Sequence, residues 1–328
     1  MTMSAAAALK GLVPHSASLV PSSVSLAGTR AAPHGASLAG HAAPLSWAPH
    51  PVAWVVLAGI ALAYALVVGR LGPSDPFRPP ANRRQLASFA GGWLCLFVAT
   101  TWPLADLARD WSLSAHMIVQ LLLVLGAPPL LLLGLPRWLL SVITRPAPLD
   151  AVLRALTTPW VATLVFCGSV VASLLPVVIA AEASSGAVQG AVDVGLVVAG
   201  LIMWLPALRL MPGVRHLSTA GRVAYLFVQS LLPNFPALVF IFAQHSLYTV
   251  YTRHAGVLGI GVLADQQIAG ALAKVVGIAV LWGVAAVIWV RAERAESAGQ
   301  DPDPLTWEDV ERELRRVERR PGRESDAH

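Results

Sequence analysis

Seven long apolar runs follow one another along the chain, separated by short polar connections. They lie near residues 51–69, 86–105, 114–134, 159–180, 188–208, 222–243 and 267–290. A helix of about 20 apolar residues is long enough to cross the roughly 30 Å hydrocarbon core of a bilayer. The pattern therefore predicts an all-α, polytopic membrane helix bundle of about seven transmembrane helices within residues 47–290.

The two ends of the chain do not share this pattern. Residues 1–46 are rich in Ala, Ser, Pro and His and show no periodicity, which favours a disordered tail or a start codon placed too early. Residues 291–328 form a charged tail, in which Thr306 is the expected N-cap of a short amphipathic helix over 306–320. We expect that helix to lie solvated on the membrane or on neighbouring loops. A docking helix for a partner is the alternative.

Composition supports the membrane interpretation. Hydrophobic residues make up 56% of the chain and charged residues 12%, whereas soluble domains carry about a quarter. The net positive charge lies in short clusters between apolar runs, which is typical of membrane topology and argues against nucleic-acid binding. Cys95 and Cys167 both lie inside apolar runs, so neither a disulfide framework nor a Cys-rich metal site is expected.

The basic residues also set an orientation. Counted over alternate connections, eighteen Lys and Arg residues lie on one side and four on the other, with Lys274 inside the last span. The positive-inside rule then places the N-terminus outside and the C-terminus in the cytoplasm. Arginine outnumbers lysine heavily, and Ala, Gly and Pro are abundant, which indicates a GC-rich bacterial genome and hence the bacterial cytoplasmic membrane.

With this orientation, most polar side chains of the spans fall in their outer halves. We call them the predicted outer set: His116 and Gln120 in the third span, Gln189 and Asp193 in the fifth, and Asp265, Gln266, Gln267 and Lys274 in the seventh. Polar groups at this depth normally face the bundle interior or an aqueous cavity. We therefore expect one polar cavity, open to the outside, in which Asp193 and Lys274 pair. The alternative is that these residues only hydrogen-bond the helices together.

Several segments resemble one known family. They are His116–Leu123, Ala127–Leu131, Leu133–Pro136, Leu247–Tyr251 and Ala264–Gly270, within a similarity that covers roughly residues 50–290. Together they resemble the CtaG-type integral-membrane assembly factors of cytochrome c oxidase. The resemblance implies a factor for assembly or maturation of a respiratory haem–copper oxidase, acting at the outer membrane face. Its expected partners are the lipid bilayer, oxidase subunits and other assembly factors.

The resemblance also implies copper, held by histidines near the outer face. This chain departs from the family pattern there, because Gln120 stands where a second histidine is usual and Gln189 and Asp193 stand where others are expected. Gln is a poor copper ligand. The remaining metal candidates are His116, His245 and His254, so the chain reads as a diverged member with an unproven copper site.

Two further function classes stay open. A transporter for a small solute or metal is suggested by Asp193, Lys274 and the proline-interrupted spans. A structural subunit of a respiratory complex is the other. An enzyme is not expected, because no nucleophile–base pair, phosphate loop or metal-hydrolase spacing is found in the sequence.

Overall fold

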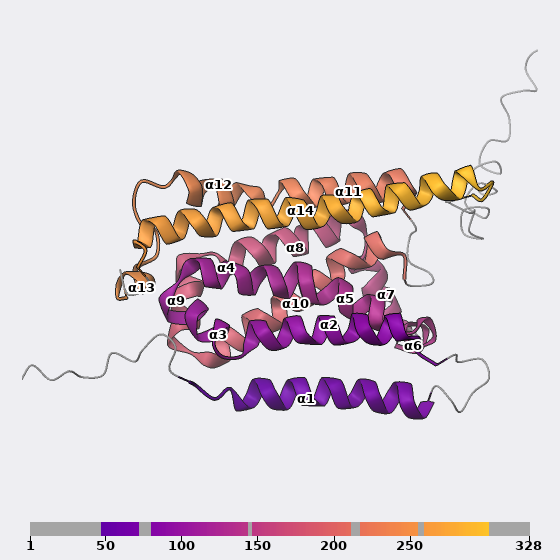
Figure 1. Cartoon of the computed structure of the whole chain (residues 1–328), viewed down its shortest axis with the longest axis horizontal. Coiled ribbons are helices and arrows are strands. Elements are labelled where there is room, and N and C mark those ends of the chain that lie inside the picture. Colours follow the sequence, from indigo (N-terminus) through magenta and orange to yellow (C-terminus); the bar gives the residue numbers. More distant parts are fainter. Residues whose placement is uncertain (1–46, 72–79, 144–145, 211–216, 255–258, 302–328) are drawn as a thin grey trace, which may run out of the picture. The chain divides into compact units, whose positions relative to one another are not determined.

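The protein is a bundle of helices in which long apolar segments lie roughly side by side (Figure 1). The computed structural model describes residues 47–71, 80–143, 146–210, 217–254 and 259–301, and no strand occurs among them. The elements are α1 (Pro51–Leu66), η1 (Val67–Leu71), α2 (Arg83–Thr100), α3 (Leu104–Asp106), η2 (Leu107–Trp111), α4 (Leu113–Leu121), η3 (Leu122–Gly126), α5 (Ala127–Gly134), α6 (Arg137–Ile143), α7 (Ala147–Leu156), α8 (Pro159–Ser173), α9 (Pro176–Ser184), α10 (Gly186–Leu208), α11 (Thr219–Leu231), α12 (Asn234–Phe242), α13 (Thr249–Thr252) and α14 (Val262–Ser297). The η elements are single π-helical turns.

The all-α, polytopic prediction is confirmed. Five helical segments are long and apolar enough to cross a membrane: Pro51–Arg70, Leu113–Gly134, Gly186–Leu208, Thr219–Phe242 and Val262–Ser297. Two bent pairs complete the set, with a bend of 48° between α2 and the α3–η2 segment and one of 65° between α8 and α9. Counting each bent pair as one span gives the seven spans predicted from the sequence.

Proline explains the bend between α8 and α9. Pro176 occupies the first turn of α9, where its missing N–H matters least, and it disfavours helical backbone at the residue before it. Leu175 accordingly has an extended backbone, so the chain changes direction there. The second part of this span, α9, is thereby turned away from the axis of α8.

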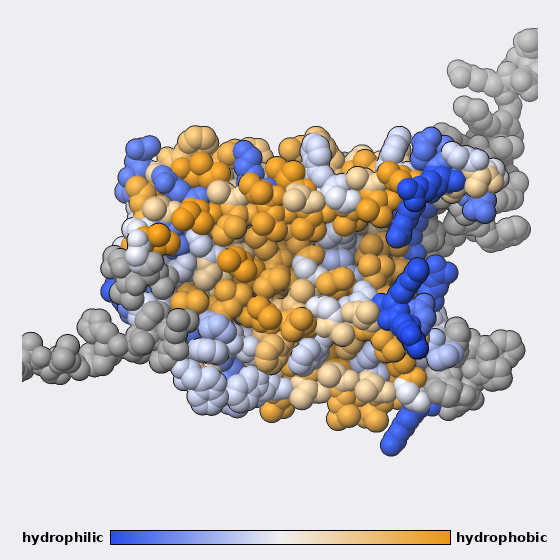
Figure 2. Space-filling model, in the orientation of Figure 1, coloured by the Kyte–Doolittle hydropathy of each residue, from blue (hydrophilic) through white to orange (hydrophobic). Residues whose placement is uncertain are grey.

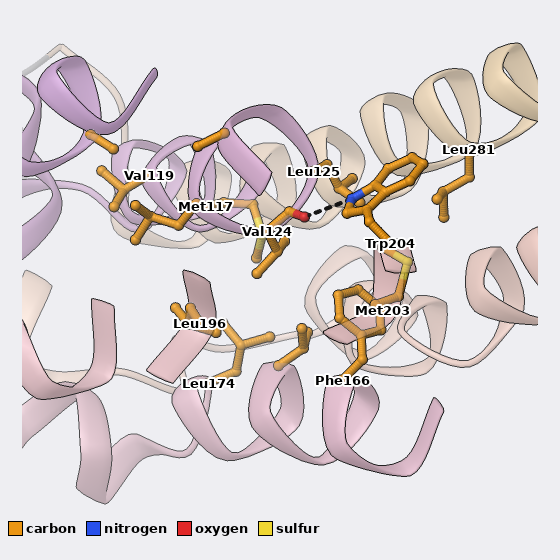
Figure 3. Close-up of a cluster of buried hydrophobic side chains, with 14 of the residues drawn as sticks. Met117, Val119, Val124, Leu125, Phe166, Leu174, Leu196, Met203, Trp204 and Leu281 are labelled. Atoms are coloured by element: carbon orange, nitrogen blue, oxygen red, sulfur yellow. Dashed lines mark hydrogen bonds between the residues drawn. The ribbon is translucent and has the colours of Figure 1, made fainter. Parts of the chain in front are cut away.

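The Ala127-Pro128-Pro129 segment is held against α10 by a compensating hydrogen bond. Pro128 has no N–H to offer the carbonyl of Val124 one turn earlier. The indole Nε1 of Trp204 donates to that carbonyl at 3.1 Å, as Figure 3 shows. Gly200 allows the approach, since a Cβ there would lie 2.7 Å from Pro128 Cγ.

The outside of the bundle is largely apolar. Figure 2 shows hydrophobic side chains over the middle of the visible face and hydrophilic ones toward its ends. The exposed apolar residues include Val52, Trp160 and Phe242, and such a surface suits lipid rather than water. α14 continues to Ser297, beyond the predicted end at 290, and its 36 residues span about 54 Å at 1.5 Å per residue. Its last turns therefore extend past a bilayer core, on the side where Arg291 and Arg294 lie.

Two sequence predictions fall outside the described residues. These are the N-terminal tail over 1–46 and the amphipathic helix over 306–320. The cytoplasmic orientation of the C-terminus stays a prediction from the arginine distribution.

Candidate functional site

The first turn of α4 is capped by a side chain from another helix. Its leading N–H groups have no partner within the helix. Asp265 of α14 supplies one, because its Oδ2 accepts from the N–H of Leu113 at 2.6 Å and its Oδ1 accepts from the Ser112 hydroxyl at 2.8 Å and the Ser114 N–H at 3.3 Å. A carboxylate at a helix N-terminus also meets the positive end of the helix dipole. Asp265, a member of the predicted outer set, therefore fastens α14 to α4.

One turn into α4, the imidazole of His116 lies beside a carboxylate from α9. His116 Nδ1 is 3.9 Å from Glu182 Oε2, a distance suited to an ion pair but longer than a hydrogen bond. The two side chains are almost wholly enclosed, with 8% of His116 and 6% of Glu182 exposed. The other polar atom of each, His116 Nε2 and Glu182 Oε1, has no hydrogen-bond partner.

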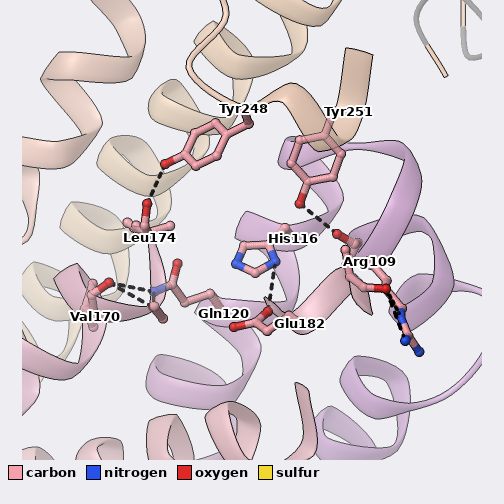
Figure 4. Close-up of polar contacts among 11 residues, drawn as sticks. Arg109, His116, Gln120, Val170, Leu174, Glu182, Tyr248 and Tyr251 are labelled. Carbon is pink, nitrogen blue, oxygen red and sulfur yellow. Dashed lines mark hydrogen bonds and ion pairs between the residues drawn. The ribbon is translucent and has the colours of Figure 1, made fainter. Parts of the chain in front are cut away.

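Gln120 lies one further turn along the same face of α4. Its Nε2 donates to the Ser173 hydroxyl at 2.7 Å and to the Val170 carbonyl at 3.3 Å, both in α8. Its Oε1 is buried and has no partner. Figure 4 shows Gln120, His116 and Glu182 gathered between α4, α8 and α9. We call these three residues the outer cluster, and it contains three buried polar atoms whose hydrogen-bonding capacity is unused.

Two tyrosines of the segment after α12 hydrogen-bond to backbone carbonyls near the outer cluster. The Tyr248 hydroxyl donates to the Leu174 carbonyl at 2.6 Å, in the bend between α8 and α9. The Tyr251 hydroxyl donates to the Ala108 carbonyl of η2 at 2.9 Å. Burial raises the pKa of both phenols, and for Tyr251 the nearby carboxylates of Glu182 and Asp265 raise it further. Both side chains therefore stay protonated donors at physiological pH and hold α13 and its preceding loop in place.

Charged groups of two more elements lie near the outer cluster. Asp193 of α10 is close enough to Glu182 for the two carboxylates to repel each other. Arg109 of η2 donates from Nε and Nη2 to the Ala183 carbonyl, each at 3.3 Å, next to Glu182 in the chain. The cluster thus lies among both signs of charge at one end of the bundle.

The predicted pair of Asp193 and Lys274 does not form. Among the described residues no ion pair joins them. Their helices have different neighbours, because α14 packs against α4, whereas α10 packs against α5, η3 and α8. Gln266 instead accepts from the Leu247 N–H at 2.8 Å, and Gln267 donates weakly to the Ala243 carbonyl at 3.4 Å. These contacts match the interhelical alternative for the seventh span.

The three metal candidates are likewise not brought together. His245 is exposed in the loop after α12. His254 stacks on Trp111, with ring centroids 4.1 Å apart, and its Nδ1 lies 3.0 Å from the Asp110 carbonyl oxygen. Within the described ranges no three His, Cys, Asp or Glu side chains form a group able to hold a metal ion, so His116, His245 and His254 do not make a three-ligand site.

Sequence reasoning left Glu182 and Ser173 out of the predicted outer set. Glu182 was the stronger omission, since it is the only acidic residue between Asp150 and Asp193 and ends an apolar run. An isolated acid at membrane depth is a sufficient signal for a functional candidate. Gln189, by contrast, belongs to the predicted set yet has no side-chain hydrogen bond among the residues that the structure covers.

Comparison with known proteins gives one match. No curated protein and no solved structure matches this chain. The family model of the cytochrome c oxidase caa3 assembly factors matches residues 61–295, a range that begins within α1 and contains the outer cluster and both tyrosines. The chain is a member of the caa3-type cytochrome c oxidase assembly factor family, CtaG.

Proposed function

We propose that this protein promotes maturation of a haem–copper oxidase from the outer half of a bacterial cytoplasmic membrane. The observation that carries the proposal is the outer cluster, which lies at the end of the bundle opposite the arginine-rich connections. Buried, incompletely paired polar groups are expensive in a membrane and usually mark a functional site. Family membership supports the process, and the position of the cluster, taken with the predicted orientation, supports action at the outer face.

The test is complementation of a deletion strain. Deleting the gene should lower the amount of assembled oxidase, measured by its haem absorbance in membranes and by the level of its subunits. Wild-type protein should restore it. His116→Ala should not, because the substitution removes the imidazole at the centre of the outer cluster, and we expect at least a threefold lower oxidase level.

The matched control is His245→Ala, which removes an exposed histidine of the same face and should restore oxidase fully. Immunoblots must show equal amounts of both variants in the membrane. Normal oxidase in the deletion strain would refute the proposal. Equal rescue by both variants would remove the outer cluster from it.

In this proposal copper is a metal that the protein passes on and not a resident cofactor. The donor set fits a multi-histidine copper cage poorly, since one buried imidazole is surrounded by carboxylate and amide oxygens. His116 nevertheless resembles the histidines of metal sites in one respect. A carboxylate faces its Nδ1, while its Nε2 has no hydrogen-bond partner. Copper content of purified protein loaded under reducing conditions should therefore fall with His116→Ala and stay unchanged with His254→Ala. An unchanged content in His116→Ala would exclude this residue as a ligand.

A further inference from the structure

A cavity lies beneath the outer cluster, deeper in the bundle. It is a partly open cavity of about 50 Å³ between α4, η3, α8, α11, α12 and α14. Gln120, Gln229 and Ser230 give it polar lining, and the other lining side chains are apolar or small, including Ala273 and Gly277 of α14. Gly277 lies 15 residues into α14, about 22 Å along the helix, so the cavity reaches the middle of the membrane.

Gln120 connects the cavity to the outer cluster. It belongs to the outer cluster and also lines the cavity. Only 3% of the residue is exposed, and its Oε1 has no hydrogen-bond partner in the protein. A buried amide oxygen without a donor is costly, and the adjoining space is where a donor can be placed.

The break between α11 and α12 lies against the same cavity. Pro233 lines it and cannot donate to the carbonyl of Gln229 one turn earlier. In helices that cross membranes, ordered water is one of the groups that satisfies backbone freed by proline. The Gln120 Oε1 and the carbonyl of Gln229 are therefore two acceptors beside the same cavity for which a water molecule can act as donor.

The size of the cavity identifies the ligand. A water molecule needs at least about 10–15 Å³ of such volume, whereas a cavity that binds benzene measures about 150 Å³. A space of about 50 Å³ accommodates a few water molecules and is about a third of the benzene-binding volume.

We propose that this cavity holds a small water cluster continuous with the outer cluster through Gln120, so that a hydrated pocket extends from the outer cluster toward the membrane midpoint. The polar lining ends there, because the remaining lining residues, such as Leu125 and Leu281, are apolar. We expect water-sized cations to reach the middle of the bundle from the end where the outer cluster lies. This inference does not depend on the oxidase role.

The test is the reactivity of engineered thiols with Ag⁺, which reaches thiols in water-filled spaces but not those facing lipid. Gly277→Cys is made in a chain where Cys95 and Cys167 are replaced by alanine. A Cβ at position 277 meets nothing within 4 Å, and the same holds for Gly283 on the same helix. Gly283→Cys, which is exposed on the apolar outside of the bundle, is therefore the matched control.

Ag⁺ is added to the outside of right-side-out vesicles, and unreacted thiols are then labelled with a maleimide after denaturation. We expect Gly277→Cys to react at least tenfold faster than Gly283→Cys, and adding Gln120→Leu to slow it toward the control. Equal rates at the two positions would overturn the proposal, as would faster reaction from the inner side. If Gly277→Cys does not accumulate, Ala273→Cys with Ala279→Cys as its exposed control decides by the same criterion.

Discussion

Replacing Asp265 with alanine should lower the free energy of unfolding by about 3 kcal/mol or more. The substitution removes the acceptor of the Ser112 hydroxyl and of the Leu113 and Ser114 N–H groups at the start of α4. Each buried donor left without a partner costs about 1–3 kcal/mol. The loss should appear as a lower midpoint in thermal unfolding of the protein in detergent, followed by circular dichroism.

Two variants separate the cap from a general effect of charge removal. Asp265→Asn keeps one carbonyl oxygen as acceptor and should lose clearly less stability than Asp265→Ala. Asp193→Ala removes another carboxylate of the membrane region, one with no hydrogen bond among the described residues, and should leave the midpoint unchanged or raise it. Equal losses for Asp265→Ala and Asp193→Ala would show that the contacts of Asp265 are not what fastens α14 to α4.

The spans were predictable because the bilayer imposes a simple rule on the sequence. Any segment that crosses it needs about 20 apolar residues with its backbone groups paired internally. Six of the seven predicted runs overlap helices that begin within a few residues of the predicted start, and the seventh, over 267–290, lies inside the longer α14 (Val262–Ser297). The extra length of α14 was missed because Asp265 and the arginines beyond 290 interrupt the apolar pattern without interrupting the helix.

The contacts at the site were less predictable. Helical spacing correctly placed His116 and Gln120 on one face of α4, since residues four apart share a face. It gave no information on which helix that face meets. The 65° bend at Pro176 brings Glu182 of α9 to His116, and a bend of that size cannot be read from a proline alone.

The seventh span illustrates the same limit. Asp265, Gln266 and Gln267 were grouped by depth into a common cavity, yet each one points to a different neighbour: the start of α4, the Leu247 N–H and the Ala243 carbonyl. Depth follows from position along a span. The neighbour toward which a side chain points depends on how its helix is rotated about its own axis in the bundle. That rotation is set by close packing at small residues, which a hydropathy profile does not reveal.

Gly270 is one of those small residues, and Gly270→Ala should destabilise the protein by about 2 kcal/mol. A Cβ at this position would lie 2.6 Å from the Ala237 carbonyl oxygen and 2.9 Å from Phe240 Cβ, so α14 and α12 would have to separate. Close helix contacts through glycine are a main source of packing energy in membranes, and overpacking a tight contact costs typically 1–3 kcal/mol.

Gly277→Ala is the control on the same helix, because its Cβ would meet nothing within 4 Å, and alanine is the better helix former by about 1 kcal/mol. Thermal unfolding in detergent should therefore show a lower midpoint for Gly270→Ala and an equal or higher one for Gly277→Ala. The same shift in both variants would mean that glycine flexibility, and not the contact between α12 and α14, sets the stability of this part of the bundle.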